Sequence, residues 1–187
     1  MNLPKLILAS GSPRRSEILA AVGWEFEKVV PDVDETVMSG ESPEDYVVRV
    51  AKMKAFEVGK KYPAGLILAA DTVVVVDKTI LGKPADPDDA RSMISKLSGR
   101  THEVLTGVVL SKNGLSENGM QRTLVTFSKL SDAEISFLVE TGNPLDKAGA
   151  YAVQAQAALF IEGIDGDYWN VVGLPISLVY RLAVRFF

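Results

Sequence analysis

The segment Leu66–Val76, which reads LILAADTVVVV, constrains the fold more than any other part of the chain. A nearly continuous aliphatic run is typical of a strand covered on both faces, and such strands belong to sheets flanked by helices. Asp71 interrupts this run, although a carboxylate buried without a partner usually pairs, binds a metal or shifts its pKa. The segment therefore predicts an α/β core and favours a functional role for Asp71. The alternative is a bend or strand end where Asp71 caps neighbouring N–H groups.

Hydrophobic patterning and turn signals predict alternating strands and helices in the rest of the chain. Strands are predicted over 6–9, 66–76, 80–81, 104–111 and 123–127, and helices over 13–22, 42–62, 86–97, 131–140 and 175–187. The strands 104–111 and 123–127 form a hairpin through the turn-rich segment 113–119, so a purely parallel sheet is not expected. No linker or repeat divides the sequence, which predicts one α/β domain over 1–187 with a mixed sheet.

Composition restricts the chemistry that such a domain can perform. The 187 residues include no cysteine and one histidine, which excludes disulfides, zinc fingers, cysteine nucleophiles and histidine-rich zinc sites. A net charge of −4 does not favour a nucleic-acid or membrane partner. No targeting segment or membrane-spanning apolar run is apparent, so we expect a cytoplasmic protein. An enzyme of this composition depends on carboxylates, Lys, Arg, Ser or Thr, with a hard oxygen-liganded metal.

The first predicted helix has an unusual N-terminus. Three other predicted helices place acids in their first turn, as the helix dipole favours, whereas this one begins Pro13-Arg14-Arg15. Ser10, Gly11 and Ser12 precede it and supply hydroxyl and backbone donors, so the segment is a candidate phosphate cradle after a strand. Two solvated arginines, at a cost of about 0.3–1 kcal/mol, explain the pattern equally well.

Two lysines are candidate site residues. Lys54 follows Val47 by seven residues and falls on the apolar face of its predicted helix, where it either reaches a cleft or, more commonly, extends past the core to water. Lys83 follows a strand, between Gly82 and Pro84. A tight turn with an exposed lysine explains Lys83 equally well.

Three other positions carry polar groups that have both functional and structural explanations. The acidic run that contains Asp32, Asp34 and Glu35 supplies oxygen ligands suited to Mg²⁺ or Mn²⁺, although such runs are more often solvated loops. Gln154 lies in a nearly apolar segment, where a buried amide needs partners that a nucleobase edge or the backbone can provide. His102 has no accompanying nucleophile motif and is interpreted as structural.

Taken in order along the chain, these signals resemble the Maf family of nucleoside triphosphate pyrophosphatases over almost the whole sequence. The motifs that carry the resemblance are Ala9–Arg15 (ASGSPRR), Asp34-Glu35, Lys54, Ala70–Val74 (ADTVV), Leu81–Pro84 (LGKP), Thr106–Val108 (TGV), Asp146–Tyr151 (DKAGAY) and Asn170–Pro175 (NVVGLP). The resemblance implies an inosine triphosphate pyrophosphatase-like fold. That fold is an elongated mixed sheet flanked by helices, with a cleft between two lobes.

The resemblance also implies an activity, which is hydrolysis of a nucleotide to its monophosphate and diphosphate. The family's proton acceptor matches Asp71, and the positions associated with substrate choice match Arg14, Thr72 and Gln154. A glutamine at 154, with Gly166–Tyr168 further on, resembles the branch that acts on dTTP and UTP, whereas the 7-methyl-GTP branch has glutamate. The family usually has glycine after this glutamine, a residue that tolerates positive φ, but this chain has Ala155.

We therefore expect Glu35 and Asp71 to hold Mg²⁺ or Mn²⁺ and to activate a water, with Asp71 as the base and Glu35 as the alternative base. Lys83 is a further catalytic candidate. The substrate-binding candidates are Ser10, Arg14, Arg15, Lys54, Thr72 and Gln154. The expected substrate is a nucleoside triphosphate, including modified pyrimidine nucleotides, and the resemblance suggests a homodimer.

Two other functions remain open at this point. One is a nucleotide-binding regulatory protein of cell division that uses the same residues without significant turnover. The other is a phosphatase or nucleotidyltransferase with the same phosphate cradle. The products distinguish them, because a phosphatase releases orthophosphate and a transferase requires an acceptor.

Overall fold

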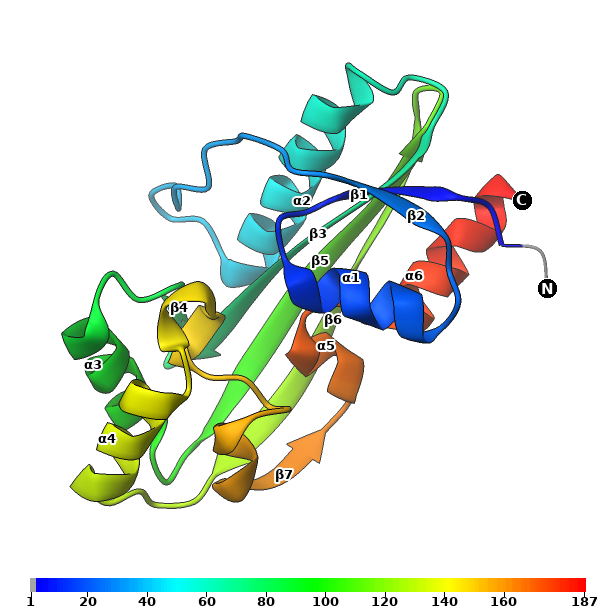
Figure 1. Ribbon diagram of the computed structural model, residues 1–187. Helices are drawn as coiled ribbons and strands as arrows, with labels where there is room; N and C mark the ends of the chain where they lie inside the picture. Colours follow the sequence, from blue (N-terminus) through cyan, green and yellow to red (C-terminus); the bar gives the residue numbers. More distant parts are fainter. Residues whose placement is uncertain (1–2) are drawn as a thin grey trace. The chain divides into compact units, whose positions relative to one another are not determined.

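The computed structural model describes residues 3–187, which include a seven-stranded mixed sheet and six α-helices, labelled in Figure 1. The strand order is β2-β1-β3-β5-β6-β7, and β4 pairs with β3. The strands are β1 (Leu6–Ala9), β2 (Phe26–Val29), β3 (Leu66–Val76), β4 (Thr79–Leu81), β5 (Thr101–Lys112), β6 (Leu115–Phe127) and β7 (Ile161–Asp165). The α-helices are α1 (Pro13–Ala21), α2 (Pro43–Gly59), α3 (Pro87–Leu97), α4 (Asp132–Thr141), α5 (Tyr168–Val172) and α6 (Ile176–Ala183). The predicted α/β class with a mixed sheet is confirmed.

The chain divides into two compact units. Unit 1 comprises Met1–Asp71, Thr106–Gln121 and Gly173–Phe187, and unit 2 comprises Thr72–Leu105 and Arg122–Val172. The predicted single domain over 1–187 and the predicted cleft between two lobes both depend on how the units combine. These two expectations stay predictions, and each unit is described by itself.

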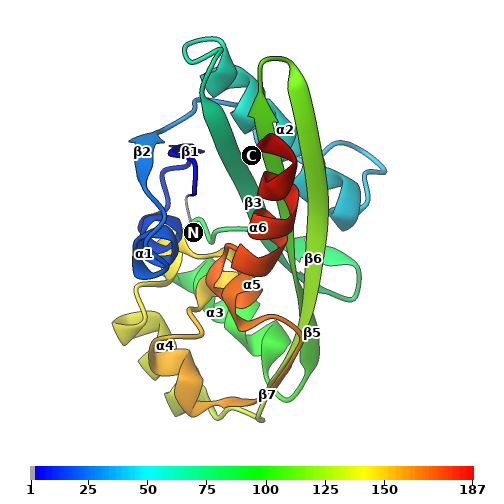
Figure 2. The same cartoon turned by 90° about the vertical axis from the view of Figure 1, so that its right-hand side faces the viewer.

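The order of the first three strands in the sheet of unit 1 reverses direction at β1. β1 pairs in parallel with β2 on one side and with β3 on the other, in the register Ala9↔Val29 and Ala9↔Ala69. The connection through α1 therefore leads from β1 to its neighbour β2 on one side. The connection through α2 leads back past β1 to β3 on the other side. Because parallel crossovers are right-handed, these two helices lie on opposite faces of β1 (Figure 2). In open α/β sheets, ligands bind beyond the carboxyl ends of the strands at such a switch point.

The helix α2 is packed closely against its face of the sheet. Alternate residues of β1, β3 and β5 form a core with α2, and its members are Ile7, Ala9, Ala51, Ala55, Val58, Ile67, Ala69 and Val109. At Gly107 the sheet has no room for a side chain, since a Cβ there would lie 2.4 Å from the carbonyl oxygen of Val47. This close approach gives a packing reason for the glycine in the Thr106–Val108 motif.

Unit 2 contains an aromatic core. The His102 ring meets Phe127 and Tyr151 edge to face, with ring centroids 5.3 and 5.5 Å apart, and its Nε2 lies 2.8 Å from the Tyr151 hydroxyl. His102 is 1% exposed, which agrees with its structural interpretation. Asn170 is also buried, and its Nδ2 donates to the Val104 carbonyl and to Thr123 Oγ1.

Several elements differ from their predicted bounds. The hairpin turn was expected over 113–119, but only Asn113 and Gly114 form it, with φ of 52° and 80°, as a two-residue hairpin turn requires. The strands β2 and β7 and the helix α5 were not predicted. They are only four or five residues long, and β2 and β7 have no buried residue, so they carry little hydrophobic periodicity. Among residues 3–187, no helix is long and apolar enough to cross a membrane.

Candidate active site

The candidate site of unit 1 lies at the carboxyl end of β1, beside the middle of the longer strand β3. Because Ala9 pairs with Ala69, Ser10 lies at the level of Ala70, and Asp71 follows one residue further along β3. Ser10 is buried, and its Oγ accepts hydrogen bonds from the Ser12 backbone N–H and from Arg15 Nη1, both at 3.1 Å. The first turn of α1 is therefore attached to the switch point of the sheet.

Arg15 is buried, so the interpretation of two solvated arginines is wrong for this residue. Its Nη1 also donates to the Ala70 carbonyl at 2.8 Å, and its Nε donates to the Gly173 carbonyl at 2.9 Å. Burial lowers the pKa of the Arg15 guanidinium, and the nearby Asp71 carboxylate opposes that shift. Arg15 thus places a buried positive charge beside Asp71 while joining α1 to two other segments. Arg14, one residue earlier, is half-buried.

Asp71, Lys54 and Glu35 form one ionic cluster. Lys54 Nζ lies 2.7 Å from Asp71 Oδ1 and 2.8 Å from Glu35 Oε1. Asp71 is buried inside β3, so the alternative of a strand end is wrong. Lys54 does point inward, as its helical face predicted, but it reaches a carboxylate instead of extending to water.

The electrostatics of this cluster suit a proton acceptor. Burial raises the pKa of Asp71, and the positive charges of Lys54 and Arg15 oppose the rise. A carboxylate with a raised pKa binds a proton more readily than an ordinary aspartate, and its cationic neighbours keep the ionised form accessible. Asp71 is therefore the group in unit 1 best suited to general-base chemistry.

The carboxylates of Glu35 and Asp71 also have the chemistry of a magnesium site. Both lie within hydrogen-bond distance of one ammonium group, so they converge on one point. Mg²⁺ in enzymes is commonly held by one or two carboxylates together with waters and substrate phosphates. Among residues 3–187, no group of three or more His, Cys, Asp or Glu side chains forms an all-protein metal site. Two carboxylates beside one ammonium group would suit a cation shared with a phosphate-bearing substrate.

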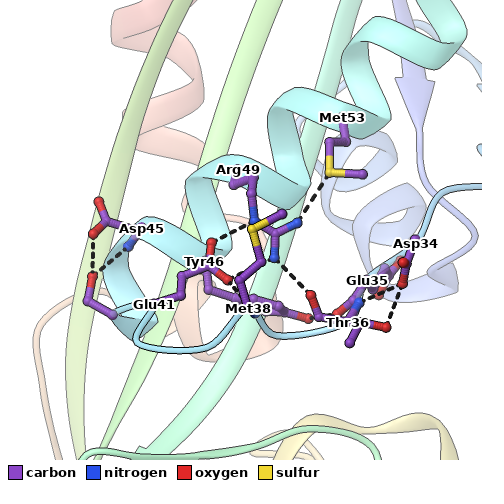
Figure 3. A network of polar contacts seen from close by, with 10 residues as sticks. Asp34, Glu35, Thr36, Met38, Glu41, Asp45, Tyr46, Arg49 and Met53 are labelled. Carbon is purple, nitrogen blue, oxygen red and sulfur yellow. Dashed lines mark hydrogen bonds and ion pairs between the residues drawn. The ribbon is translucent and has the colours of Figure 1, made fainter.

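Glu35 is presented by an exposed loop between β2 and α2, and two residues of α2 that the sequence did not single out hold this loop (Figure 3). Tyr46 Oη donates to the Glu35 carbonyl at 2.8 Å. Arg49 Nη2 donates to the Thr36 carbonyl at 3.0 Å. Tyr46 and Arg49 are three residues apart, which indicates that they share a face of the helix. The sequence did not show that this face contacts the loop that carries Glu35.

Three predicted site residues belong to unit 2. Thr72 follows Asp71 in β3 and is half-buried, and Lys83 is exposed on the bend after β4. Gln154 is exposed in a turn, so the expectation of a buried amide is wrong, because its neighbours Tyr151 and Val153 fill the core instead. Ala155 has a φ of −125°, a conformation that alanine adopts without strain. The roles of these three residues stay predictions.

The turn before Lys83 is supported by Gly149. Its N–H donates to the Gly82 carbonyl at 3.0 Å. Gly149 has a φ of 67°, and a Cβ there would lie 2.7 Å from Cγ2 of Val74. Both the backbone conformation and the lack of space require glycine at this position of the Asp146–Tyr151 motif.

A pocket of about 610 Å³ lies elsewhere in unit 1. It is lined by α2, β3 and the β5–β6 turn, including Phe56, Ile67 and Leu115. Lys54 and Asp71 lie outside this lining, so the pocket is separate from the ionic cluster.

The fold and site together define an α/β protein with a buried aspartate–lysine pair at the switch point of parallel strands. A family model described as Maf-like protein matches residues 5–186. The chain is 48% identical over 184 residues to the dTTP/UTP pyrophosphatase of Symbiobacterium thermophilum, covering 98% of this chain and 95% of that protein. It is 51% identical over 186 residues to a protein of the same name from Anaeromyxobacter dehalogenans, covering 97% and 94%.

The chain belongs to the Maf family, as its motifs indicated. Among solved structures, the Ham1 protein of Staphylococcus aureus is 12% identical, with a TM-score of 0.46 over 66% of this chain and 71% of that chain.

Proposed function

We propose that this protein is a nucleoside triphosphate pyrophosphatase that hydrolyses dTTP and UTP to the nucleoside monophosphate and diphosphate. The observation that carries the proposal is the buried Asp71 carboxylate, paired with Lys54 inside β3 and beside the buried Arg15 of α1. The names of the relatives, which are 45–51% identical, support the choice of substrates.

In the proposed reaction, Asp71 accepts a proton from a water molecule that attacks the α-phosphorus. A bond forms between that water oxygen and the α-phosphorus, and the bond from the α-phosphorus to the bridging oxygen of the β-phosphate breaks. The bridging oxygen leaves with the electron pair as part of diphosphate. General-base assistance of this kind contributes about 10²–10⁴-fold to rate.

The positive charges of the site offset the charge that develops on the phosphates. Ser10 and the N-terminal turn of α1 provide hydroxyl and backbone donors, and Arg14 lies in that turn. The Lys54 ammonium favours the ionised form of Asp71 and also contacts the Glu35 carboxylate. We include Thr72, Lys83 and Gln154 in the proposal as predicted contacts to the substrate.

Glu35 and Asp71 would hold a divalent cation, Mg²⁺ or Mn²⁺, which supplies charge neutralisation at the phosphate oxygens and lowers the pKa of a bound water. The role of this chain's own residues is to bring two carboxylates to one point. Cytoplasmic localisation and a homodimer belong to the same proposal.

The test is a panel of nucleoside triphosphates with Mg²⁺ or Mn²⁺, scored for monophosphate, diphosphate and orthophosphate. We expect dTTP and UTP to give monophosphate and diphosphate. Asp71→Asn is expected to reduce that turnover by about 100-fold or more. Asp88→Asn, which changes an exposed aspartate of α3, serves as the matched control and is expected to retain activity.

Three results would contradict the proposal. Near-normal turnover by Asp71→Asn would exclude this residue as the base. Orthophosphate as the first product would indicate a phosphatase. Binding of dTTP without diphosphate release at saturating metal would support a nucleotide-binding regulatory protein instead.

A further inference from the structure

The loop that carries Glu35 is largely exposed. It connects β2, which ends at Val29, to α2, which begins at Pro43, and every residue from Asp34 to Gly40 is exposed. An exposed loop without sheet or helix pairing ordinarily samples many conformations, and fixing each residue costs backbone entropy. A carboxylate on such a loop needs other contacts before it can be held at a reacting centre.

Two side chains of α2 provide these contacts at consecutive carbonyls. Tyr46 Oη donates to the carbonyl of Glu35, and Arg49 Nη2 donates to the carbonyl of Thr36 (Figure 3). Because Tyr46 and Arg49 are three residues apart on a helix, they lie on one face. The loop backbone is therefore attached to α2 at two consecutive peptide groups, the one that follows Glu35 and the one that follows Thr36.

The Arg49 side chain is itself fixed in place. Its guanidinium donates to both carboxylate oxygens of Glu41, at 2.6 and 2.8 Å, and lies over the Tyr46 ring, 5.4 Å from its centroid. Glu41 Oε2 also accepts from the Met38 backbone N–H at 3.1 Å. A paired, planar guanidinium loses less entropy per hydrogen bond than a free side chain, so Arg49 is preorganised to donate to Thr36.

Tyr46 is suited to be a permanent donor. The residue is 7% exposed and its hydroxyl lies 2.8 Å from the Glu35 carbonyl oxygen. A phenol hydroxyl is protonated throughout the physiological range, so it donates to this carbonyl.

We propose that Tyr46 and Arg49 are positioning residues for Glu35, because they fix the backbone of residues 35–36 so that the Glu35 carboxylate meets Lys54. The helix α2 carries Tyr46, Arg49 and Lys54 together, so one rigid element sets the position of Glu35 relative to the Lys54–Asp71 pair. The expected effect of Tyr46 and Arg49 on catalysis rests on the proposed function. The structural part of the inference, the order of the loop, is independent of that function.

The first measurement is hydrogen–deuterium exchange of the protein without nucleotide or metal. Tyr46→Phe removes one hydroxyl, and Arg49→Met removes the guanidinium while keeping an apolar side chain. Each is expected to speed amide exchange in residues 34–41 by about fivefold or more, as the loss of one hydrogen bond to the backbone predicts. Lys52→Met, on an exposed position of the same helix, is the matched control and is expected to leave exchange unchanged.

The second measurement is a double-mutant cycle with Glu35→Gln, scored by kcat/KM for dTTP. Tyr46→Phe alone is expected to lower kcat/KM about fivefold, through kcat more than KM, and Arg49→Met to lower it about tenfold. In the Glu35→Gln background both effects are expected to vanish, since the two residues act through Glu35. Arg49→Lys is expected to restore only part of the loss, because an ammonium cannot reproduce the bidentate contact with Glu41.

The outcomes separate the two proposals. If the wild-type protein releases no diphosphate from any nucleotide, the proposed function fails, while the exchange measurement still tests the positioning. Unchanged exchange in residues 34–41 would overturn the positioning role. Effects on kcat/KM that persist in Glu35→Gln would also overturn it, because they would show a route that does not include Glu35. Faster exchange throughout α2 would assign both residues to helix stability instead.

Discussion

The ammonium nitrogen of Lys54 lies 2.7 Å from Oδ1 of Asp71, and each of these side chains is only 9% exposed. The pair joins the middle of α2 to the middle of β3, inside the unit that also holds Ser10 and Arg15. Removing one member of a buried ion pair leaves the other as an uncompensated charge, which costs more than the pair contributes. Lys54 and Asp71 are therefore coupled in stability as well as in the proposed chemistry.

Lys54→Met is expected to destabilise the protein by about 3 kcal/mol, because it leaves the Asp71 carboxylate buried without its cation. Asp71→Asn is expected to cost less, since the amide is neutral and Lys54 keeps Glu35 as a partner. The double variant is expected to be more stable than Lys54→Met alone. Denaturant unfolding measures all three free energies.

Lys52→Met is the control for this cycle, because Lys52 is exposed on the same helix. It is expected to change the free energy of unfolding by less than about 0.5 kcal/mol. Additive effects of the Lys54 and Asp71 substitutions would contradict the coupling.

His102 is expected to make the protein sensitive to acid. Burial lowers the pKa of His102 from 6.5 to about 4, so the unfolded chain binds its proton more tightly than the folded one. The contribution of neutral His102 to the free energy of unfolding is therefore complete above the pKa of the histidine in the unfolded chain. It is lost as the pH falls toward 4. Between about pH 7 and about pH 5 this residue accounts for a loss of roughly 2 kcal/mol.

The comparison of wild type with His102→Gln at these two pH values isolates that contribution. The variant is expected to be less stable at neutral pH, because it loses ring packing against Phe127 and Tyr151. Its free energy of unfolding is expected to fall less with acidification. Equal pH dependence in the two proteins would show that His102 titrates normally.

Gly107→Ala is expected to displace α2. The added Cβ would lie 2.4 Å from the Val47 carbonyl oxygen and 2.8 Å from the Val48 nitrogen, which are backbone atoms of the helix. Such overpacking costs about 3 kcal/mol. Gly163→Ala is the control, since nothing lies within 4 Å of its Cβ, and it is expected to be nearly neutral in thermal unfolding. Wild-type stability of Gly107→Ala would show that the helix can shift freely.

Turnover is expected to require a divalent cation, and Glu35→Gln is expected to raise the metal concentration for half-maximal activity about tenfold or more. The substitution keeps the size of the side chain but removes its charge. Asp32→Asn changes another exposed acid of the same segment and is expected to have little effect. A chelator that leaves diphosphate release unchanged would contradict the metal requirement.

Patterns that lie within one segment predicted much of the structure. The bounds of β1 and β3 match their predictions, because continuous aliphatic runs have few other solutions in a soluble domain. The inward direction of Lys54 followed from helical spacing. Asp71, a carboxylate within an aliphatic run, identified the centre of the candidate site, because burying a charge costs free energy in any fold.

Features that depend on distant segments were not predictable in this way. The carbonyls that Arg15 binds, at Ala70 and Gly173, are 55 and 158 residues away in sequence. In the sequence, Tyr46 and Arg49 are ordinary helix residues. Only the structure shows that the loop at Glu35 lies against them. Gln154 was expected to be buried because its neighbours are apolar, yet the chain turns so that Tyr151 and Val153 enter the core.

The sequence by itself determined the α/β class, the family and the list of charged groups, because periodicity and motif order are local properties. Only the tertiary structure decided which charges meet. Lys54 pairs with Asp71 and Glu35, and Arg15 is bound to backbone carbonyls, because the change in winding at β1 brings three separate segments to one strand end. A hydrogen bond needs its donor and acceptor about 3 Å apart, and the attraction between charges weakens as their separation grows, so distances in space, not positions in sequence, assign those roles.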